Sequence, residues 1–277
     1  MALKTEYQTV KIEREDGITW VILNRPEKRN CMNPQMHFEM AEILRELETD
    51  DETQVMVLTG AGDAWCAGQD LKQFFRELDN DPVGRWRAGQ ATSEWRFDRL
   101  YLFPKPTVAM VNGYCFGGAF TQLFSCDFAI AAEDAIFGLS EVNWGIIPGG
   151  IVTKVVADAL SYRDALYYIM TGDHFDGKQA AAMRLINYAV PRARLREETV
   201  ALCNKLKSKN PATVRACKEA YKVIRTMDYT QAKLWLEAKA SWLAAIDKED
   251  GRNKGIRQFV DEKRYRPGLG AYIRDEQ

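Results

Sequence analysis

The N-terminal part of the chain changes its hydrophobic period twice. Residues 9–14 alternate between apolar and polar side chains, Asp16-Gly17 is a turn dipeptide, and residues 18–23 are mostly apolar. This order predicts a β-hairpin. Asn33-Pro34 then predicts a helix start, because asparagine is a good N-cap and proline suits the first turn. The apolar face of this helix would be formed by Met36, Met40, Ile43, Leu44 and Leu47.

Further along, short apolar runs alternate with helical patterns. Runs at 55–59, 106–111 and 128–131 predict buried strands, and the pattern over 83–101 predicts a helix. Strands that alternate with helices indicate β-α-β units and a mostly parallel sheet.

The character of the chain changes near residue 190, after which we find no strand pattern. Helical patterns cover 195–207, 211–226, 230–246 and 253–263. We therefore expect an α/β core over 1–190 and a helical region over 191–277.

Composition and charge narrow the range of functions. The chain has 277 residues and a formal net charge of -1, which does not favour a nucleic-acid or anionic-membrane partner. No apolar run reaches the roughly 18 residues of a membrane span, and the first residues lack the apolar segment of a signal peptide. The six cysteines include no Cys-x-x-Cys pair, so we expect no metal site and no disulfide framework, and a cytoplasmic location.

The two histidines, His37 and His174, both lie in polar stretches that we expect at the periphery of the fold. They leave little material for a catalytic triad, although two histidines cannot exclude one that forms only in the fold.

Gly113, Gly117 and Gly118 follow the strand predicted at 106–111. Their spacing matches neither a dinucleotide-binding fingerprint nor a P-loop. Close packing of a helix against a strand explains such glycines as well as a functional role does. In the functional interpretation, a helix starting near Gly117 presents free backbone N–H groups, and Gly118 lets a substrate oxygen approach one of them.

A second turn of the same kind follows the strand predicted at 55–59. Ala67 and Gly68 precede a probable helix start at Asp70, so the N–H of Gln69 would point outward. Turns at the carboxyl edge of one parallel sheet bring two such donors together. They would form the two halves of an oxyanion hole.

Longer motifs carry a resemblance over nearly the whole chain. They include Leu23-Asn-Arg-Pro-Glu-Lys-Arg-Asn30, Ala67-Gly-Gln-Asp-Leu71, Ala109-Met-Val-Asn-Gly113, Gly117-Gly118 and Phe137-Gly-Leu-Ser-Glu-Val-Asn-Trp-Gly-Ile146. In these motifs the sequence resembles the crotonase, or enoyl-CoA hydratase/isomerase, superfamily. Within it, Tyr167-Tyr-Ile-Met-Thr-Gly172 and the 137–146 motif are most similar to the hydroxycinnamoyl-CoA hydratase/lyases.

The resemblance implies the α/β crotonase fold, in which repeated ββα units form two perpendicular sheets. It implies homotrimers or hexamers (dimers of trimers), with the C-terminal helices mediating contacts and closing the acyl pocket. It also implies an acyl-CoA thioester whose carbonyl oxygen lies between the N–H groups of Gln69 and Gly118.

The same resemblance implies the chemistry. Simple hydratases of this superfamily use two glutamates; here the first position is Thr121 and the second is Glu141. Glu141 would act as general base on water and then as acid at Cα, before the β-hydroxy thioester breaks into an aryl aldehyde and acetyl-CoA. Thr121 would position the water or the hydroxyl. No metal and no cofactor beyond coenzyme A is implied.

The remaining site residues are carried over by position. An acyl pocket would be lined by Phe74, Phe120, Trp144, Trp235 and Glu237. Coenzyme A would be contacted by Arg25, Lys28, Arg29, Ala67, Asp70, Lys72 and Lys263, with Arg264 as an alternative to Lys263.

The sequence also departs from the pattern. Phe74 and Glu237 occupy positions where the lyases carry tyrosines, and Gln69 stands where methionine is expected. An enoyl-CoA hydratase without cleavage, a thioester or carbon–carbon hydrolase, and a non-catalytic RNA-associated homologue therefore stay as alternatives.

Overall fold

Two β-sheets form the centre of the molecule. The computed structural model describes residues 7–266, 268 and 270–274. The larger sheet has the order β1-β2-β3-β5-β7-β10 and the smaller one the order β4-β6-β8-β9. Their bounds are β1 Val10–Glu15, β2 Ile18–Leu23, β3 Val55–Gly60, β4 Ala64–Cys66, β5 Thr107–Val111, β6 Tyr114–Phe116, β7 Phe128–Ala132, β8 Ile136–Gly138, β9 His174–Asp176 and β10 Tyr188–Val190.

The predicted hairpin and parallel sheet are both confirmed. Strands β1 and β2 pair antiparallel with Val10 opposite Leu23, and the larger sheet continues parallel from β2 to β10. Strand β3 is buried along its whole length. Alternate residues of β3 join two different apolar clusters, because Met56 contributes to the main core while Val57 packs with Cys203 on the opposite face.

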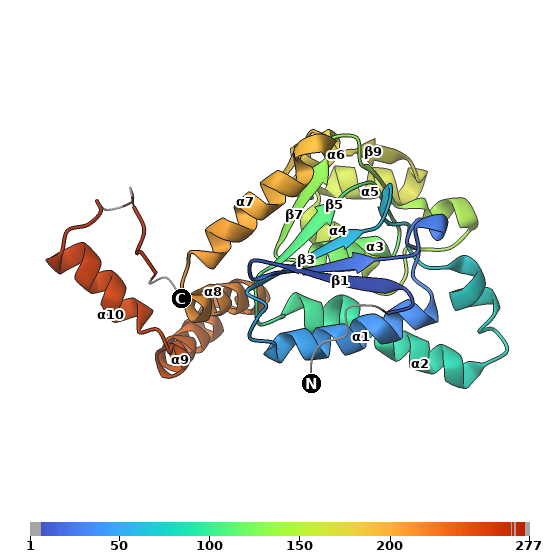
Figure 1. Ribbon diagram of the computed structural model, residues 1–277. Coiled ribbons are helices and arrows are strands. Elements are labelled where there is room, and N and C mark those ends of the chain that lie inside the picture. The colour runs from blue at the N-terminus through green and yellow to red at the C-terminus, as the bar shows by residue number, and fades with distance from the viewer. Residues whose placement is uncertain (1–6, 267, 269, 275–277) are drawn as a thin grey trace.

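Helices cover both faces of the larger sheet (Figure 1). The helices are α1 Pro34–Thr49, α2 Pro82–Ser93, α3 Ala119–Ser125, α4 Val152–Ala159, α5 Tyr162–Thr171, α6 Gly177–Ala182, α7 Leu195–Lys207, α8 Pro211–Ile224, α9 Tyr229–Ile246 and α10 Gly251–Ile256. The shorter helical segments are η1 Pro26–Lys28, η2 Leu71–Arg76, η3 Glu94–Arg99, η4 Ser140–Trp144, η5 Arg192–Arg194 and η6 Arg257–Asp261. Within the described ranges, no helix is both long and apolar enough to cross a membrane.

Helix α1 follows the sequence prediction closely. The side chain of Asn33 accepts a hydrogen bond from the Met36 N–H at 3.0 Å, and Pro34 occupies the first turn. Every residue of the predicted apolar face is fully buried against the sheet. The N-terminal α/β part therefore forms from local signals that agree with one another.

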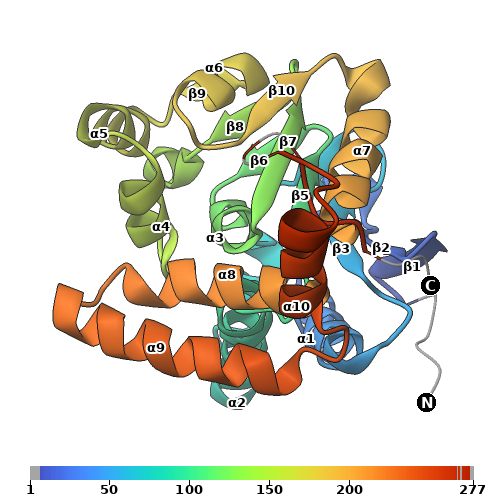
Figure 2. The ribbon, with the colours of Figure 1, turned by 90° about the vertical axis from the view of Figure 1, so that its left-hand side faces the viewer.

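After β10, each element of the described part is helical, as expected. Helices α8 and α9 lie side by side beneath the sheets (Figure 2). A buried ionic cluster attaches α8 to the α/β part: Lys218 Nζ lies 2.8 Å and Lys222 Nζ 2.7 Å from the two carboxylate oxygens of Asp127. The roles of the 191–277 region in oligomerisation and in closing a pocket stay predictions.

Candidate active site

The two strand-to-helix turns predicted to meet do lie together. Gly68 follows β4 and Gly117 follows β6, and these two strands pair in parallel. Gly68 has a φ of +87°, and a Cβ built on it would lie 2.8 Å from the Phe116 carbonyl oxygen and 3.5 Å from the Gly118 nitrogen. Only glycine allows this contact, which fixes the distance between the turns.

Both predicted backbone donors are free. Met32 donates to the Gly68 carbonyl and accepts from the Asp70 N–H, each at 2.8 Å, so the intervening Gln69 N–H faces the other way. Gly118 is the N-cap of α3. Among the described residues, neither the Gln69 nor the Gly118 N–H has a hydrogen-bond acceptor. Two such donors, side by side, form a place for an oxyanion.

Glu141 lies directly against this pair of turns. It sits in η4, the segment after β8, and a Cβ built on Gly117 would be 2.8 Å from its Oε1. Gly117 also has a φ of +53°, a conformation that side chains disfavour. Burial raises the pKa of Glu141 above its ordinary value. A buried carboxylate with a raised pKa is suited to exchange protons near neutral pH.

Two oxygens beside these turns lack protein partners. Thr121 is 1% exposed and one turn into α3, yet its Oγ1 has no hydrogen-bond partner within the described ranges, and the same holds for Glu141 Oε2. Threonines inside helices usually bond back to a carbonyl of the preceding turn. Buried oxygens without partners indicate a site for water or substrate.

A hydrogen-bonded chain positions the Gln69 side chain. Trp95 Nε1–H donates to His37 Nδ1 at 2.8 Å, so His37 Nε2 carries the proton and donates to Gln69 Oε1, also at 2.8 Å. The expectation that His37 is peripheral is wrong, since it is fully buried. Its position four residues before Ala41, on the apolar stripe of α1, was the signal. His174 is exposed, as expected.

The buried His37 predicts an acid-sensitive fold. Burial lowers the pKa of His37 to about 3. Between about pH 6.5 and pH 3 the unfolded chain therefore binds a proton that the folded chain refuses, and stability falls as the pH falls. At pH 5 the cost is about 2 kcal/mol. Urea denaturation at pH 7 and at pH 5 measures the fall in the free energy of unfolding between the two pH values. We expect this fall to be smaller by about 2 kcal/mol in His37→Gln. The prediction would be contradicted if His37→Gln showed the same fall as the wild type. It would also be contradicted if the exposed control His174→Gln reduced the fall equally.

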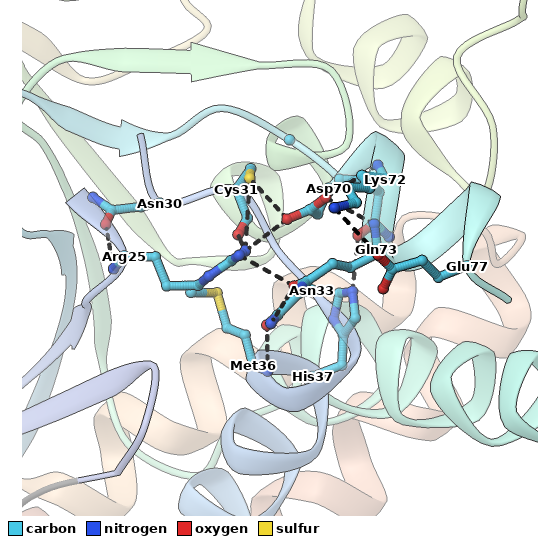
Figure 3. Close-up of polar contacts among 12 residues, drawn as sticks. Arg25, Asn30, Cys31, Asn33, Met36, His37, Asp70, Lys72, Gln73 and Glu77 are labelled. Atoms are coloured by element: carbon cyan, nitrogen blue, oxygen red, sulfur yellow. Dashed lines mark hydrogen bonds and ion pairs between the residues drawn. The ribbon is translucent and has the colours of Figure 1, made fainter. Parts of the chain in front are cut away.

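Arg25 and Asp70 form a clamp beside the site (Figure 3). Arg25 Nη1 lies 3.0 Å from Asp70 Oδ2 and donates to the Cys31 carbonyl at 2.7 Å. Asp70 also caps η2 by accepting from the backbone N–H groups of Lys72 and Gln73. Burial alone would raise the pKa of Asp70, but the Gln73 N–H and the Arg25 guanidinium lower it. The clamp fixes the start of η2 directly after Gln69.

The other residues predicted to contact coenzyme A lie in two separate regions of the molecule. Arg29 accepts a backbone hydrogen bond from Ala67 at 3.0 Å, and the side chains of Lys28, Arg29 and Lys72 are exposed around the clamp. Lys263 is exposed beyond α10, which lies at the opposite end of the molecule from α2 (Figure 1). One chain therefore brings together the first group and not Lys263.

The predicted acyl-pocket residues are also dispersed. The ring of Phe74 contacts His37 edge-on, with centroids 5.3 Å apart. Phe120 instead packs in the core, 1% exposed, against Phe137 and Phe175. Trp144 lies in η4 and is 65% exposed.

Trp235 and Glu237 lie on α9, which packs against α8. Glu237 is exposed 3.9 Å from Lys233 and lines a surface groove of about 890 Å³ together with Leu236. Trp235 lies beside Lys239, whose Nζ is 5.7 Å from the ring centroid. Within the described ranges, we find no contact of either residue with Gln69, Gly118 or Glu141.

Comparison with known proteins places this geometry in context. The enoyl-CoA hydratase/isomerase family model matches residues 13–267. A hydroxycinnamoyl-CoA hydratase-lyase of Pseudomonas fluorescens is 50% identical over 97% of this chain and 98% of its own. The solved enoyl-CoA hydratase of Bacillus anthracis is 28% identical with a TM-score of 0.83, covering 97% of this chain and 100% of that chain. A putative enoyl-CoA hydratase of Streptomyces coelicolor, at 18% identity and TM-score 0.84, shows the shared fold alone.

Proposed function

Because this chain belongs to the enoyl-CoA hydratase/isomerase family, we propose that it is a lyase that hydrates an aromatic enoyl-CoA and then cleaves the product. The substrate would be of the hydroxycinnamoyl- or feruloyl-CoA type, and the products an aryl aldehyde and acetyl-CoA. The 50% identity to a hydroxycinnamoyl-CoA hydratase-lyase over nearly the full length supports this choice. The observation that carries the chemistry is the half-buried Glu141 carboxylate beside the Gln69 and Gly118 N–H groups; its Oε2 is buried without a partner among the described residues.

In the first step the thioester oxygen accepts hydrogen bonds from Gln69 and Gly118. Negative charge grows on this oxygen as an enolate forms, and one well-placed donor is worth about 3–4 kcal/mol in comparable sites. Glu141 takes a proton from water, whose oxygen bonds to Cβ, and the carboxylic acid then returns a proton to Cα. Thr121 Oγ1, which lacks a partner in the described protein, would hold the water or the new hydroxyl.

Cleavage reverses an aldol addition. A base, for which Glu141 is again the available carboxylate, removes the β-hydroxyl proton, and the Cα–Cβ bond breaks. The electron pair of that bond forms the acetyl-CoA enolate, which the same two N–H groups stabilise, and the aryl aldehyde leaves. Protonation of the enolate at Cα gives acetyl-CoA. No cofactor beyond coenzyme A takes part in this proposal, because the thioester itself acidifies Cα.

Binding and assembly follow the same proposal. The coenzyme A phosphates would be contacted by Lys28, Arg29 and Lys72. The ion pair between Arg25 and Asp70 would hold together the two segments that carry these basic residues. Trp235, Glu237 and Lys263 would act from a neighbouring copy of a homotrimer or hexamer. A cytoplasmic location is supported by six free cysteines.

One observation favours a second candidate, an enoyl-CoA hydratase that stops at the β-hydroxy thioester. Phe74 contacts His37 at the predicted ring pocket and offers no hydrogen bond to a ring hydroxyl. Without such a bond, cleavage loses a means of orienting the aryl group.

A product assay separates the two candidates. We expect feruloyl-CoA to give vanillin and acetyl-CoA, resolved by chromatography beside cinnamoyl-CoA and crotonyl-CoA. Accumulation of β-hydroxy thioester alone, or turnover of crotonyl-CoA alone, would support the hydratase and overturn the lyase. Absence of turnover on all three thioesters would overturn both.

A further inference from the structure

Arg96 places a buried positive charge directly behind the Gly118 turn. It lies in η3, the segment that continues α2, and is 7% exposed. Its Nη1 donates to the Gly118 carbonyl oxygen at 2.9 Å, and its Nε donates to the Thr92 carbonyl at 3.4 Å. The neighbouring Trp95 points to His37 from the same segment, which is a wide π-helical turn of a kind often found at functional sites.

This guanidinium has no carboxylate partner in the part of the chain that the structure describes. Among the residues that the structure describes, Arg96 forms no ion pair, unlike Arg99 three residues later, which pairs with Glu48 and Glu94. Burial lowers the pKa of Arg96 to about 10, so the side chain stays charged at neutral pH. A buried and unpaired charge is costly to a fold. A bound negative charge would offset this cost, and the described residues do not supply one.

The surroundings of the guanidinium are those of the thioester site. Arg96 Nη1 is 3.1 Å from the point that a Cβ on Gly118 would occupy, and Gln69 Cγ is 3.5 Å from that point. Arg96 Nη2 is 3.7 Å from the corresponding point on Gly150, in the loop that follows Glu141. Nη2 makes no hydrogen bond within the described ranges. Holding the Gly118 carbonyl alone would require only a neutral donor.

We propose that Arg96 is a positioning residue that holds the Gly118 peptide in place and supplies the fixed positive charge that stabilises the enolate. This inference rests on the proposed thioester chemistry. The charge would act on the oxygen bound to the Gly118 N–H, where negative charge develops only during reaction. Preorganised charge of this kind lowers the barrier more than it strengthens substrate binding.

The test compares Arg96→Met, Arg96→Lys and the matched control Arg99→Met, which removes a cation of the same segment that pairs away from the site. We expect Arg96→Met to lower kcat about 10²-fold, with KM changed less than about threefold. Arg96→Lys, which keeps the charge, should recover about 10-fold of this loss. Arg99→Met should keep wild-type kinetics. The exchange of acetyl-CoA methyl protons in D2O, followed by NMR, should fall in parallel because it requires only enolate formation.

Thermal unfolding separates electrostatic from structural roles. A buried charge without a counter-charge destabilises the fold, so its removal in Arg96→Met should keep or raise the Tm. Wild-type kcat and exchange in Arg96→Met would overturn the inference. So would an equal loss in both Arg96 variants accompanied by a lower Tm. Glu141→Gln distinguishes failure of this inference from failure of the proposed function. If Glu141→Gln also keeps wild-type turnover, the proposed function itself is wrong.

Discussion

Glu141→Gln is expected to lower kcat by about 10²–10⁴-fold, the usual contribution of a general acid–base group. Glutamine keeps the shape of the side chain that lies against Gly117, but it cannot take or return a proton. In the proposed mechanism backbone N–H groups bind the thioester oxygen, so KM should change only a few-fold. Steady-state kinetics with feruloyl-CoA, and binding of a non-reactive saturated thioester, measure the two quantities separately.

The pH profile provides an independent check on Glu141. Hydration needs the ionised carboxylate, so kcat/KM should fall as the pH drops through the pKa of Glu141. Burial raises this pKa, which moves the fall to a higher pH than an exposed glutamate would give. The half-exposed Glu133, paired with Lys178, offers the control Glu133→Gln, which should keep both activity and profile. Near-wild-type activity in Glu141→Gln would refute the mechanism.

Asp127→Ala is expected to lower the free energy of unfolding by about 3–5 kcal/mol, because it leaves buried cations without their counter-charge. Lys218 and Lys222 are at most 10% exposed and both contact this carboxylate. The Thr107 N–H also donates to it, at 2.8 Å. The change therefore removes both ion pairs between α8 and Asp127, the residue that precedes β7. Urea denaturation at fixed protein concentration measures the loss.

The exposed Asp134 provides a matched control for Asp127. It pairs with Arg192 at 3.0 Å in solvent, so Asp134→Ala should cost at most about 1 kcal/mol. Adding Lys218→Met to Asp127→Ala should restore part of the stability, because one of the uncompensated charges is then gone. Equal losses for Asp127→Ala and Asp134→Ala would show that the cluster does not hold α8 in place.

Local signals in the sequence were sufficient for five of the six strands of the larger sheet, for α1 and α2, and for the helices after β10. The hairpin followed from alternation and a turn dipeptide, and α1 from an N-cap and an apolar stripe. The second sheet was expected only from the family resemblance. Its strands β4, β6, β8 and β9 have three residues each, which is too short to show a hydrophobic period.

The backbone part of the site was also predictable from sequence. Glycine at 68 and 117 marks positions where a Cβ would collide and where φ is positive, and at 118 a Cβ would lie 3.1 Å from Arg96 Nη1. Such positions can be recognised from residue type. The free N–H groups of Gln69 and Gly118 follow from these turns. Glu141 was assigned from its place in the family pattern, and the structure puts its carboxylate against Gly117.

What the sequence by itself determined is thus the order of elements and the two turns, because helix caps, hydrophobic periods and glycines act over a few residues. Only the tertiary structure decided that His37 joins Trp95 to Gln69, that Arg25 clamps Asp70, and that Arg96 is buried behind Gly118. These contacts join residues that are 22 to 58 positions apart. Their energies depend on burial and on the absence of competing partners, and neither is encoded in any local stretch of the chain.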